Sequence, residues 1–161
     1  MLKTKKTKKT NAKPKPKKRL LAKAHLLVVD DEADFAQMIQ KSLGQSGYKV
    51  DTATTATQAI ALQRRHSYDL ALVDLRMPEM TGLELLQYLK VRDKSIFVII
   101  MTAYGSFSIG IESLRKGACD YVAKPFKLKT LKDKVTEALE RRAQFLEEQR
   151  IFPQRSTLDE W

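Results

Sequence analysis

The chain has 161 residues, of which 43% are hydrophobic and 30% are charged. This length fits a single domain, and the apolar content is enough for a core, which excludes a wholly disordered protein. No apolar run approaches the roughly 20 residues of a membrane-spanning helix, so we do not expect a transmembrane segment. The single cysteine, Cys119, excludes a disulfide framework and favours a cytoplasmic setting.

The net charge of +11 is concentrated at the start of the chain. Residues 1–24 contain ten Lys, one Arg and no acidic residue, which leaves 19 basic and 19 acidic residues in 25–161. Because the like charges repel and the segment has no apolar period, we expect a disordered Lys-rich arm. The neutral remainder argues against a folded basic domain that binds nucleic acid.

Short apolar runs alternate with stretches of helical periodicity through the rest of the chain. In the helix expected at 33–46, for example, Phe35, Met38, Ile39 and Leu43 recur at helical spacing. In chain order the pattern predicts strands at 25–29, 48–53, 70–73, 96–101 and 119–123, and helices at 33–46, 55–66, 82–91, 107–116 and from 128 to about 150.

Runs without polar residues indicate strands that are buried on both faces, as in a parallel sheet covered by helices. We therefore predict an α/β domain with a doubly wound, five-stranded parallel sheet over residues 25–140. Residues 141–161 should extend the last helix until Pro153 stops it, and then form a loose tail. We expect no second domain.

Polar side chains follow four of the predicted strands. Asp30 and Asp31 come after the first strand, Asp74 after the third, Thr102 after the fourth and Lys124 after the fifth. Because ligand sites in such sheets lie beyond the carboxyl ends of the strands, we expect these side chains to share one shallow pocket.

Clustered carboxylates repel one another and need a cation. Hard oxygen ligands from few protein groups suit Mg²⁺, which keeps several waters and favours a phosphate partner. A lysine and a hydroxyl could hold phosphoryl oxygens, and the central carboxylate could then attack phosphorus to form an aspartyl phosphate. The pattern thus indicates phosphoryl transfer with Mg²⁺ as cofactor.

The segments VVDDE, VDLRMPEMTG, MTA and KPF, in this order and spacing, resemble the receiver domain of two-component response regulators. The resemblance covers about residues 25–140. MTAYG and GACDYVAKPF resemble the nitrogen-regulation type, and we expect a stand-alone receiver without an output domain behind it. The resemblance implies a flavodoxin-like (βα)5 fold with strand order 2-1-3-4-5.

The resemblance also implies a metal site. Asp31 and Asp74 would bind Mg²⁺ directly, the backbone carbonyl of Arg76 would be a third protein ligand, and Asp30 would act through water.

For the phosphoryl group, the resemblance implies that Asp74 is the phosphoacceptor. Thr102 and Lys124 would hold phosphoryl oxygens, and Lys124 would pair with Asp74 in the unphosphorylated state. Tyr121 matches the switch aromatic on the fifth strand. The bond between Lys124 and Pro125 is expected to be cis.

The partners implied are a sensor histidine kinase or a histidine phosphotransfer protein, and an unknown downstream protein. Residues 1–24 would bind polyanions without sequence preference, because they supply phosphate attraction but no base-reading element. An anionic membrane or an acidic protein is the alternative for this arm.

Three other function classes remain open. The chain could be a phosphatase with a nucleophilic Asp, although such enzymes usually place it after the first strand with a second Asp two residues on. It could be a nucleic-acid-binding regulator that uses the Lys-rich arm. It could also be a fragment of a larger ATPase-type transcriptional regulator, because the last helix resembles the linker in such proteins. Cys119 is expected to be a small buried hydrophobic residue, and His25 and His66 are expected to be structural or exposed.

Overall fold

The computed structural model describes residues 24–103 and 107–153. The predicted arm, apart from Ala24, and the predicted tail lie outside the described residues. Five strands and five helices alternate along the chain. The strands are β1 His25–Val29, β2 Lys49–Ala53, β3 Leu70–Asp74, β4 Phe97–Thr102 and β5 Asp120–Ala123. The helices are α2 Ala33–Gln45, α3 Ala56–Arg65, α4 Gly82–Arg92, α5 Phe107–Arg115 and α6 Leu128–Ile151.

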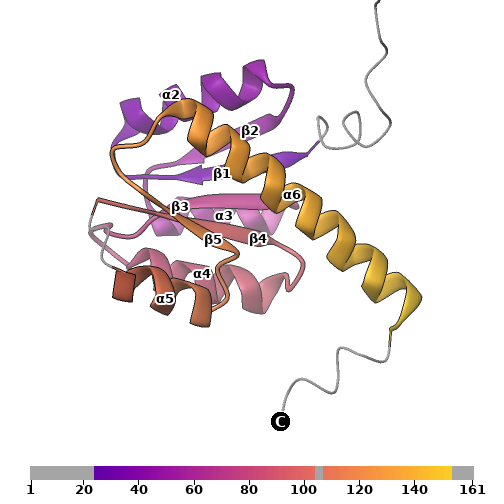
Figure 1. Ribbon diagram of the computed structural model, residues 1–161. Coiled ribbons are helices and arrows are strands. Elements are labelled where there is room, and N and C mark those ends of the chain that lie inside the picture. Colours follow the sequence, from indigo (N-terminus) through magenta and orange to yellow (C-terminus); the bar gives the residue numbers. More distant parts are fainter. Residues whose placement is uncertain (1–23, 104–106, 154–161) are drawn as a thin grey trace, which may run out of the picture.

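The five strands form one parallel sheet in the order β2-β1-β3-β4-β5, which confirms the predicted fold (Figure 1). Alternate residues of β1 face opposite sides of this sheet. Leu26 and Val28 pack in a core with α2 and α6, whereas Leu27 and Val29 pack in a second core with α3 and α4. Both sets are completely buried, which is why the strand reads as an unbroken apolar run.

The helix ends differ from the predicted ones by a residue or so, because capping residues were counted as helix. Thr55 is the N-cap of α3 and accepts a hydrogen bond from the backbone N–H of Gln58, while His66 is the C-cap. Thr81 forms a capping box with Glu84 at the start of α4.

The predicted core face of α2 is mostly confirmed, with one exception. Ile39 and Leu43 are buried, whereas Met38 is 44% exposed. On α3 the polar Gln63 is buried, which periodicity in apolar residues could not indicate.

Helix α6 continues well past the sheet (Figure 1). Its first half buries Leu131, Val135, Ala138 and Leu139. Further along, Arg142 forms an ion pair with Asp69 at 2.7 Å. The helix ends at Ile151, close to the predicted end. No helix in residues 24–103 and 107–153 has the length and apolarity to cross a membrane.

The two histidines are structural or exposed, as predicted, and Cys119, which was expected to be buried, packs against the core on the side of α2 and α6. Cys119 is partly buried, and this burial raises the pKa of its thiol to about 11. His25 lies half-buried with its Nε2 atom 2.7 Å from Asp51 Oδ2, and its ring packs against Tyr68 at 4.4 Å between centroids. His66 is exposed.

Candidate functional site

The sheet brings the predicted site residues to one edge. Asp30 directly follows β1, Asp74 ends β3, Thr102 ends β4 and Lys124 directly follows β5. Asp30, Asp31 and Asp74 each offer a carboxylate oxygen within 4.8 Å of the others. Asp30 is fully buried and Asp74 is 8% exposed, whereas Asp31 is open to solvent. The arrangement is a small acidic pocket with one solvent-facing side.

Lys124 lies between the two buried carboxylates. Its Nζ atom is 2.6 Å from Asp30 Oδ2 and 3.3 Å from Asp74 Oδ1. The predicted pairing with Asp74 is therefore present, and a shorter contact with Asp30 accompanies it. The bond between Lys124 and Pro125 is cis, as expected.

Phe35 also belongs to the pocket, and the sequence gave no sign of this. Its ring lies under the Lys124 ammonium, with 4.4 Å from Nζ to the ring centroid, and packs edge-on against Phe126 at 5.8 Å. The ring face attracts the cation. In the sequence Phe35 is indistinguishable from a core residue of α2.

Asp30 has both carboxylate oxygens engaged within the protein. Oδ1 accepts a hydrogen bond from the Glu32 backbone N–H at 2.9 Å, and Oδ2 accepts one from Lys124. Asp31 and Asp74 are therefore better placed to offer oxygens directly to a cation. Arg76 lies two residues beyond Asp74 at the same edge, with its side chain exposed.

Burial and the neighbouring charge of Asp30 raise the pKa of Asp74 to about 6, against the opposing attraction of Lys124. This is above the value of roughly 3.9 in an unfolded chain, so Asp74 destabilises the cation-free fold as the pH rises from about 4 through 6. Burial alone would lower the pKa of Lys124, but the hydrogen bond and charge of Asp30, with Asp74, raise it overall. A bound cation would reduce the charge repulsion that Asp74 experiences.

Residues 26–136 match the family model of the response regulator receiver domain. The chain belongs to this receiver family. The match ends inside α6, so the last turns of this helix lie beyond the part that the family shares.

The receiver domain resembles both short and long curated relatives. It is 41% identical to the transcriptional regulatory protein ZraR of Klebsiella oxytoca over 71% of this chain and 26% of that one. It is 36% identical to sporulation initiation phosphotransferase F of Bacillus subtilis over 71% of this chain and 92% of that one. The chain thus spans about a quarter of the length of ZraR. It spans 54% of the length of PhoP of Pseudomonas aeruginosa.

Solved structures agree with this assignment. A CheY-like receiver domain protein from Methanospirillum hungatei JF-1 is 30% identical with a TM-score of 0.72, over 76% of this chain and 98% of that one. NtrX from Brucella abortus, solved in complex with ATP, is 29% identical with a TM-score of 0.74, over 77% of this chain and 28% of that one.

Tyr121 of the receiver domain lies on β5, half-buried against α5. A Cβ atom at Gly110 of α5 would come within 2.5 Å of the Tyr121 ring, so this glycine provides the space that the ring occupies. Thr102, at the end of the neighbouring strand β4, is 1% exposed, and its carbonyl accepts a hydrogen bond from the Lys124 backbone N–H at 2.7 Å. This hydrogen bond links the end of β4 to Lys124 of the acidic pocket, which directly follows the strand that carries Tyr121.

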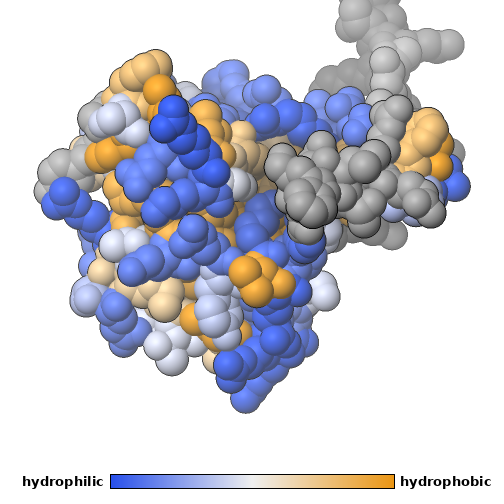
Figure 2. All heavy atoms as spheres, turned by 90° about the horizontal axis from the view of Figure 1, so that it is seen from below, coloured by the Kyte–Doolittle hydropathy of each residue, from blue (hydrophilic) through white to orange (hydrophobic). Residues whose placement is uncertain are grey.

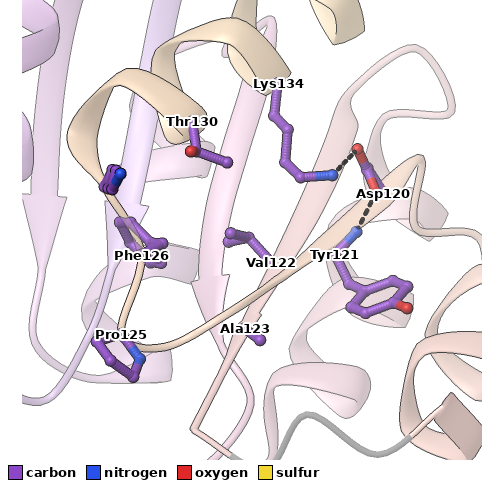
Figure 3. A pocket seen from close by; sticks show the side chains of 9 residues that line it. Asp120, Tyr121, Val122, Ala123, Pro125, Phe126, Thr130 and Lys134 are labelled. Atoms are coloured by element: carbon purple, nitrogen blue, oxygen red, sulfur yellow. Dashed lines mark hydrogen bonds and ion pairs between the residues drawn. The ribbon is translucent and has the colours of Figure 1, made fainter.

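A groove of about 650 Å³ runs between β5 and the start of α6 (Figure 3). Asp120 and Lys134 form an ion pair across it at 2.8 Å, and Asp120 Oδ1 also accepts a hydrogen bond from the Tyr121 backbone N–H. In Figure 3 the Tyr121 ring points away from Thr130 and Lys134 of α6. The ring instead meets Gly110 of α5.

Gly82 holds the loop after β3 against α4. Its N–H donates to the Leu75 carbonyl at 2.7 Å, and a Cβ atom there would overlap the backbone carbonyl of Asp74. Only glycine permits this approach. The sequence showed a glycine at a helix start, but gave no reason to connect it with the acidic pocket.

We expect Gly82→Ala to displace the Asp74 backbone and to lower the free energy of unfolding by about 1–3 kcal/mol, as overpacking does. Gly44→Ala is the matched control, because a Cβ atom at Gly44 of α2 would meet nothing within 4 Å. The control should be neutral or more stable by up to about 1 kcal/mol. Chemical denaturation checks both, and equal stabilities for the two variants would contradict the assigned contact.

Proposed function

We propose that Asp74 is the phosphoacceptor of this receiver domain. The observation that carries the proposal is its place: a buried carboxylate at the end of β3, grouped with Asp30 and Asp31 and 3.3 Å from the Lys124 ammonium. A carboxylate oxygen of Asp74 attacks phosphorus of a partner's phosphohistidine. The new O–P bond replaces the P–N bond, and the histidine leaves with the electron pair of that bond.

The other pocket residues position the phosphoryl group and neutralise its charge. Lys124 exchanges its present contact with Asp74 for a phosphoryl oxygen, and its raised pKa keeps it cationic. The Thr102 hydroxyl donates to a second phosphoryl oxygen. Charge neutralisation and placement of this kind account for most of the catalysis in phosphoryl transfer.

A divalent cation with a preference for oxygen ligands, Mg²⁺, fits the pocket. Asp31 and Asp74 would hold it directly with the backbone carbonyl of Arg76, and Asp30 would act through water, because its own oxygens already accept protein hydrogen bonds. When bound, the ion neutralises phosphoryl oxygens and relieves the repulsion among the carboxylates.

The partners proposed are a sensor histidine kinase or a histidine phosphotransfer protein in the cytoplasm. The relative from Bacillus subtilis carries the name of a phosphotransferase, which agrees with this. A downstream protein would read the change around Tyr121 and α5. The Lys-rich segment 1–24 would attract polyanions as an accessory function.

Exposure to an acyl phosphate and Mg²⁺ should add one phosphoryl group, about 80 Da, to the intact protein through formation of an aspartyl phosphate. Asp74→Asn should abolish this gain. Asp133→Asn, which changes an exposed carboxylate of α6, is the matched control and should be phosphorylated as the parent is. Full phosphorylation of Asp74→Asn in mass spectrometry would refute the assignment.

Millimolar Mg²⁺ should raise the free energy of unfolding by about 1–2 kcal/mol at ten-fold saturation, because the ion binds only the native pocket. Asp31→Asn should lose most of this gain and keep the stability of the cation-free parent or exceed it. Asp133→Asn should retain the gain. Thermal unfolding with and without Mg²⁺ measures these differences, and an unchanged Mg²⁺ effect in Asp31→Asn would exclude Asp31 as a ligand.

Phosphorylation should shift the ring signals of Tyr121 in NMR spectra, because Thr102 is drawn toward the phosphoryl group and frees space beside β5. Thr102→Ala should still be phosphorylated, but its switching equilibrium should be weakened at least ten-fold, since a hydrogen bond to a charged oxygen is worth about 1.5–3 kcal/mol. Thr102→Ser keeps the hydroxyl and should switch normally. Equal Tyr121 shifts in the Ala variant and the parent would contradict this coupling.

A further inference from the structure

One aromatic ring beside the acidic pocket makes a contact that core packing alone does not explain. Phe35 is the third residue of α2, and its partly buried side chain packs against the core that α2 and α6 form with the sheet. The face of its ring lies against the ammonium of Lys124, with 4.4 Å from Nζ to the ring centroid. A ring face attracts a cation at this distance, and the attraction is stronger where water is excluded. The ring therefore acts on the ammonium that contacts Asp74.

Two segments of the chain hold this ring in place. Phe35 lies in the first turn of α2, directly after the loop that carries Asp30 and Asp31. Its ring packs edge-on against Phe126 at 5.8 Å between centroids, and Phe126 is two residues beyond Lys124. Edge-to-face pairs of this kind favour one relative orientation of the two rings. The orientation of the Phe35 ring is thus set by the segments that carry the acidic residues and the lysine.

The Lys124 ammonium has three N–H donors but only two oxygen partners. Nζ is 2.6 Å from Asp30 Oδ2 and 3.3 Å from Asp74 Oδ1. Within residues 24–103 and 107–153, no third oxygen contacts Nζ. The side chain of Lys124 is only 16% exposed, and the Phe35 ring lies on one of its remaining sides. The ring takes a place beside the ammonium that water would otherwise fill.

The ring and the carboxylates hold the ammonium by different forces. The attraction to Asp74 is between opposite charges, so it weakens when a cation or a phosphoryl group compensates the charge of that carboxylate. A cation in the pocket would also repel the ammonium. The ring of Phe35 carries no charge, and its attraction for the ammonium does not depend on either event. Phe35 can therefore keep Lys124 in the pocket while the contact with Asp74 is lost.

An exposed hydrophobic side chain is not by itself a sign of function. The face of the molecule that α4 and α5 form has scattered hydrophobic residues among hydrophilic ones (Figure 2). Phe107, at the start of α5, is 77% exposed. Single residues of this kind are common on protein surfaces. Phe35 differs from them, because its ring faces a lysine that also contacts two buried carboxylates.

We propose that Phe35 is a positioning residue for phosphoryl transfer, which holds the Lys124 ammonium in the pocket while its contact passes from Asp74 to a phosphoryl oxygen. This role rests on the proposed function of Asp74. No bond forms or breaks at the ring, and Phe35 acts only through the lysine. Weakening the ring face should therefore slow phosphorylation and leave its site unchanged.

Fluorination of the ring tests this role with little change of shape. The full chain is prepared with phenylalanine analogues that carry one, two or three ring fluorines in place of Phe35, because each fluorine withdraws electrons from the ring face. The rate constant of phosphorylation by an acyl phosphate is measured by intact mass at a fixed Mg²⁺ concentration. It should fall with each fluorine, by about three- to ten-fold in all. Equal rate constants across the series would overturn the proposal.

Phe97 offers the matched control, because its ring also lies beside a lysine. The ring is partly buried against the same core, and Lys90 Nζ is 5.2 Å from its centroid. Phe35→Leu should slow phosphorylation at least about three-fold, whereas Phe97→Leu should leave the rate at the parent value. Phe35→Tyr keeps a ring face and should retain most of the parent rate. An equal loss in the two leucine variants would show a general packing effect and would contradict the role of Phe35.

A double-mutant cycle with Lys124 measures the contact itself, without phosphoryl donor or Mg²⁺. Phe35→Leu, Lys124→Met and the double variant are compared with the parent by chemical denaturation. The coupling should be about five-fold in the unfolding equilibrium constant, which corresponds to a cation–π contact of about 1 kcal/mol. In the Lys124→Met background, Phe35→Leu should cause no further loss of phosphorylation rate. Zero coupling, or a loss of rate that persists without the lysine, would refute the proposal.

Phosphorylation of the parent separates this role from the proposed function. If the parent and all Phe35 variants gain the phosphoryl mass on Asp74 at one rate, the role of Phe35 is wrong and that of Asp74 stands. If Asp74→Asn is phosphorylated as fully as the parent, the proposed function is wrong. The positioning role then fails with it, even where the cycle shows the contact between Phe35 and Lys124.

Discussion

Repulsion among carboxylates that the fold holds together is the constraint on which the site depends. Asp30 and Asp74 are buried within a few ångströms of each other, and this raises the pKa of Asp74 to about 6. Lys124 compensates part of the repulsion by contacting both, and Phe35 lies under its ammonium. An added cation would therefore stabilise the pocket, and under the proposed function Asp74 would lose its contact with Lys124 when the lysine binds a phosphoryl oxygen.

The apolar interior of the sheet supplies the stability that offsets the repulsion among these carboxylates. The four residues from Leu26 to Val29 are fully buried, and so are those from Leu70 to Val73. Burying apolar surface contributes roughly 25 cal/mol per Å², so these two strands support an acidic edge that would be unfavourable by itself. Because the strands are parallel, their carboxyl ends meet at one edge of the sheet. The interiors of the strands stabilise the fold, and the residues just past each strand form the functional site.

The sequence was informative wherever a feature is local or periodic. Strand order, the grouping of Asp30, Asp31 and Asp74, and the position of Lys124 follow from apolar runs, from the residues after them and from the resemblance to receivers. Phe35 and Gly82 could not be found in this way. Each acts through a contact with a residue distant in sequence: the Lys124 ammonium for Phe35 and the Asp74 carbonyl for Gly82. The burial of Gln63 was not predicted, because the core face of a helix is recognised from the spacing of its apolar residues.

Two glycines allow helices α4 and α5 to pack closely against residues at or near the acidic edge of the sheet. Gly82 brings α4 against the backbone of Asp74, and Gly110 brings α5 against the ring of Tyr121. At both points a helix approaches so closely that even a methyl group would not fit without movement. Close-packed contacts transmit small displacements instead of absorbing them. Under the proposed function, a phosphoryl group on Asp74 would act on α4 through the backbone and on α5 through Thr102 and Tyr121, so both helices would respond to one covalent event.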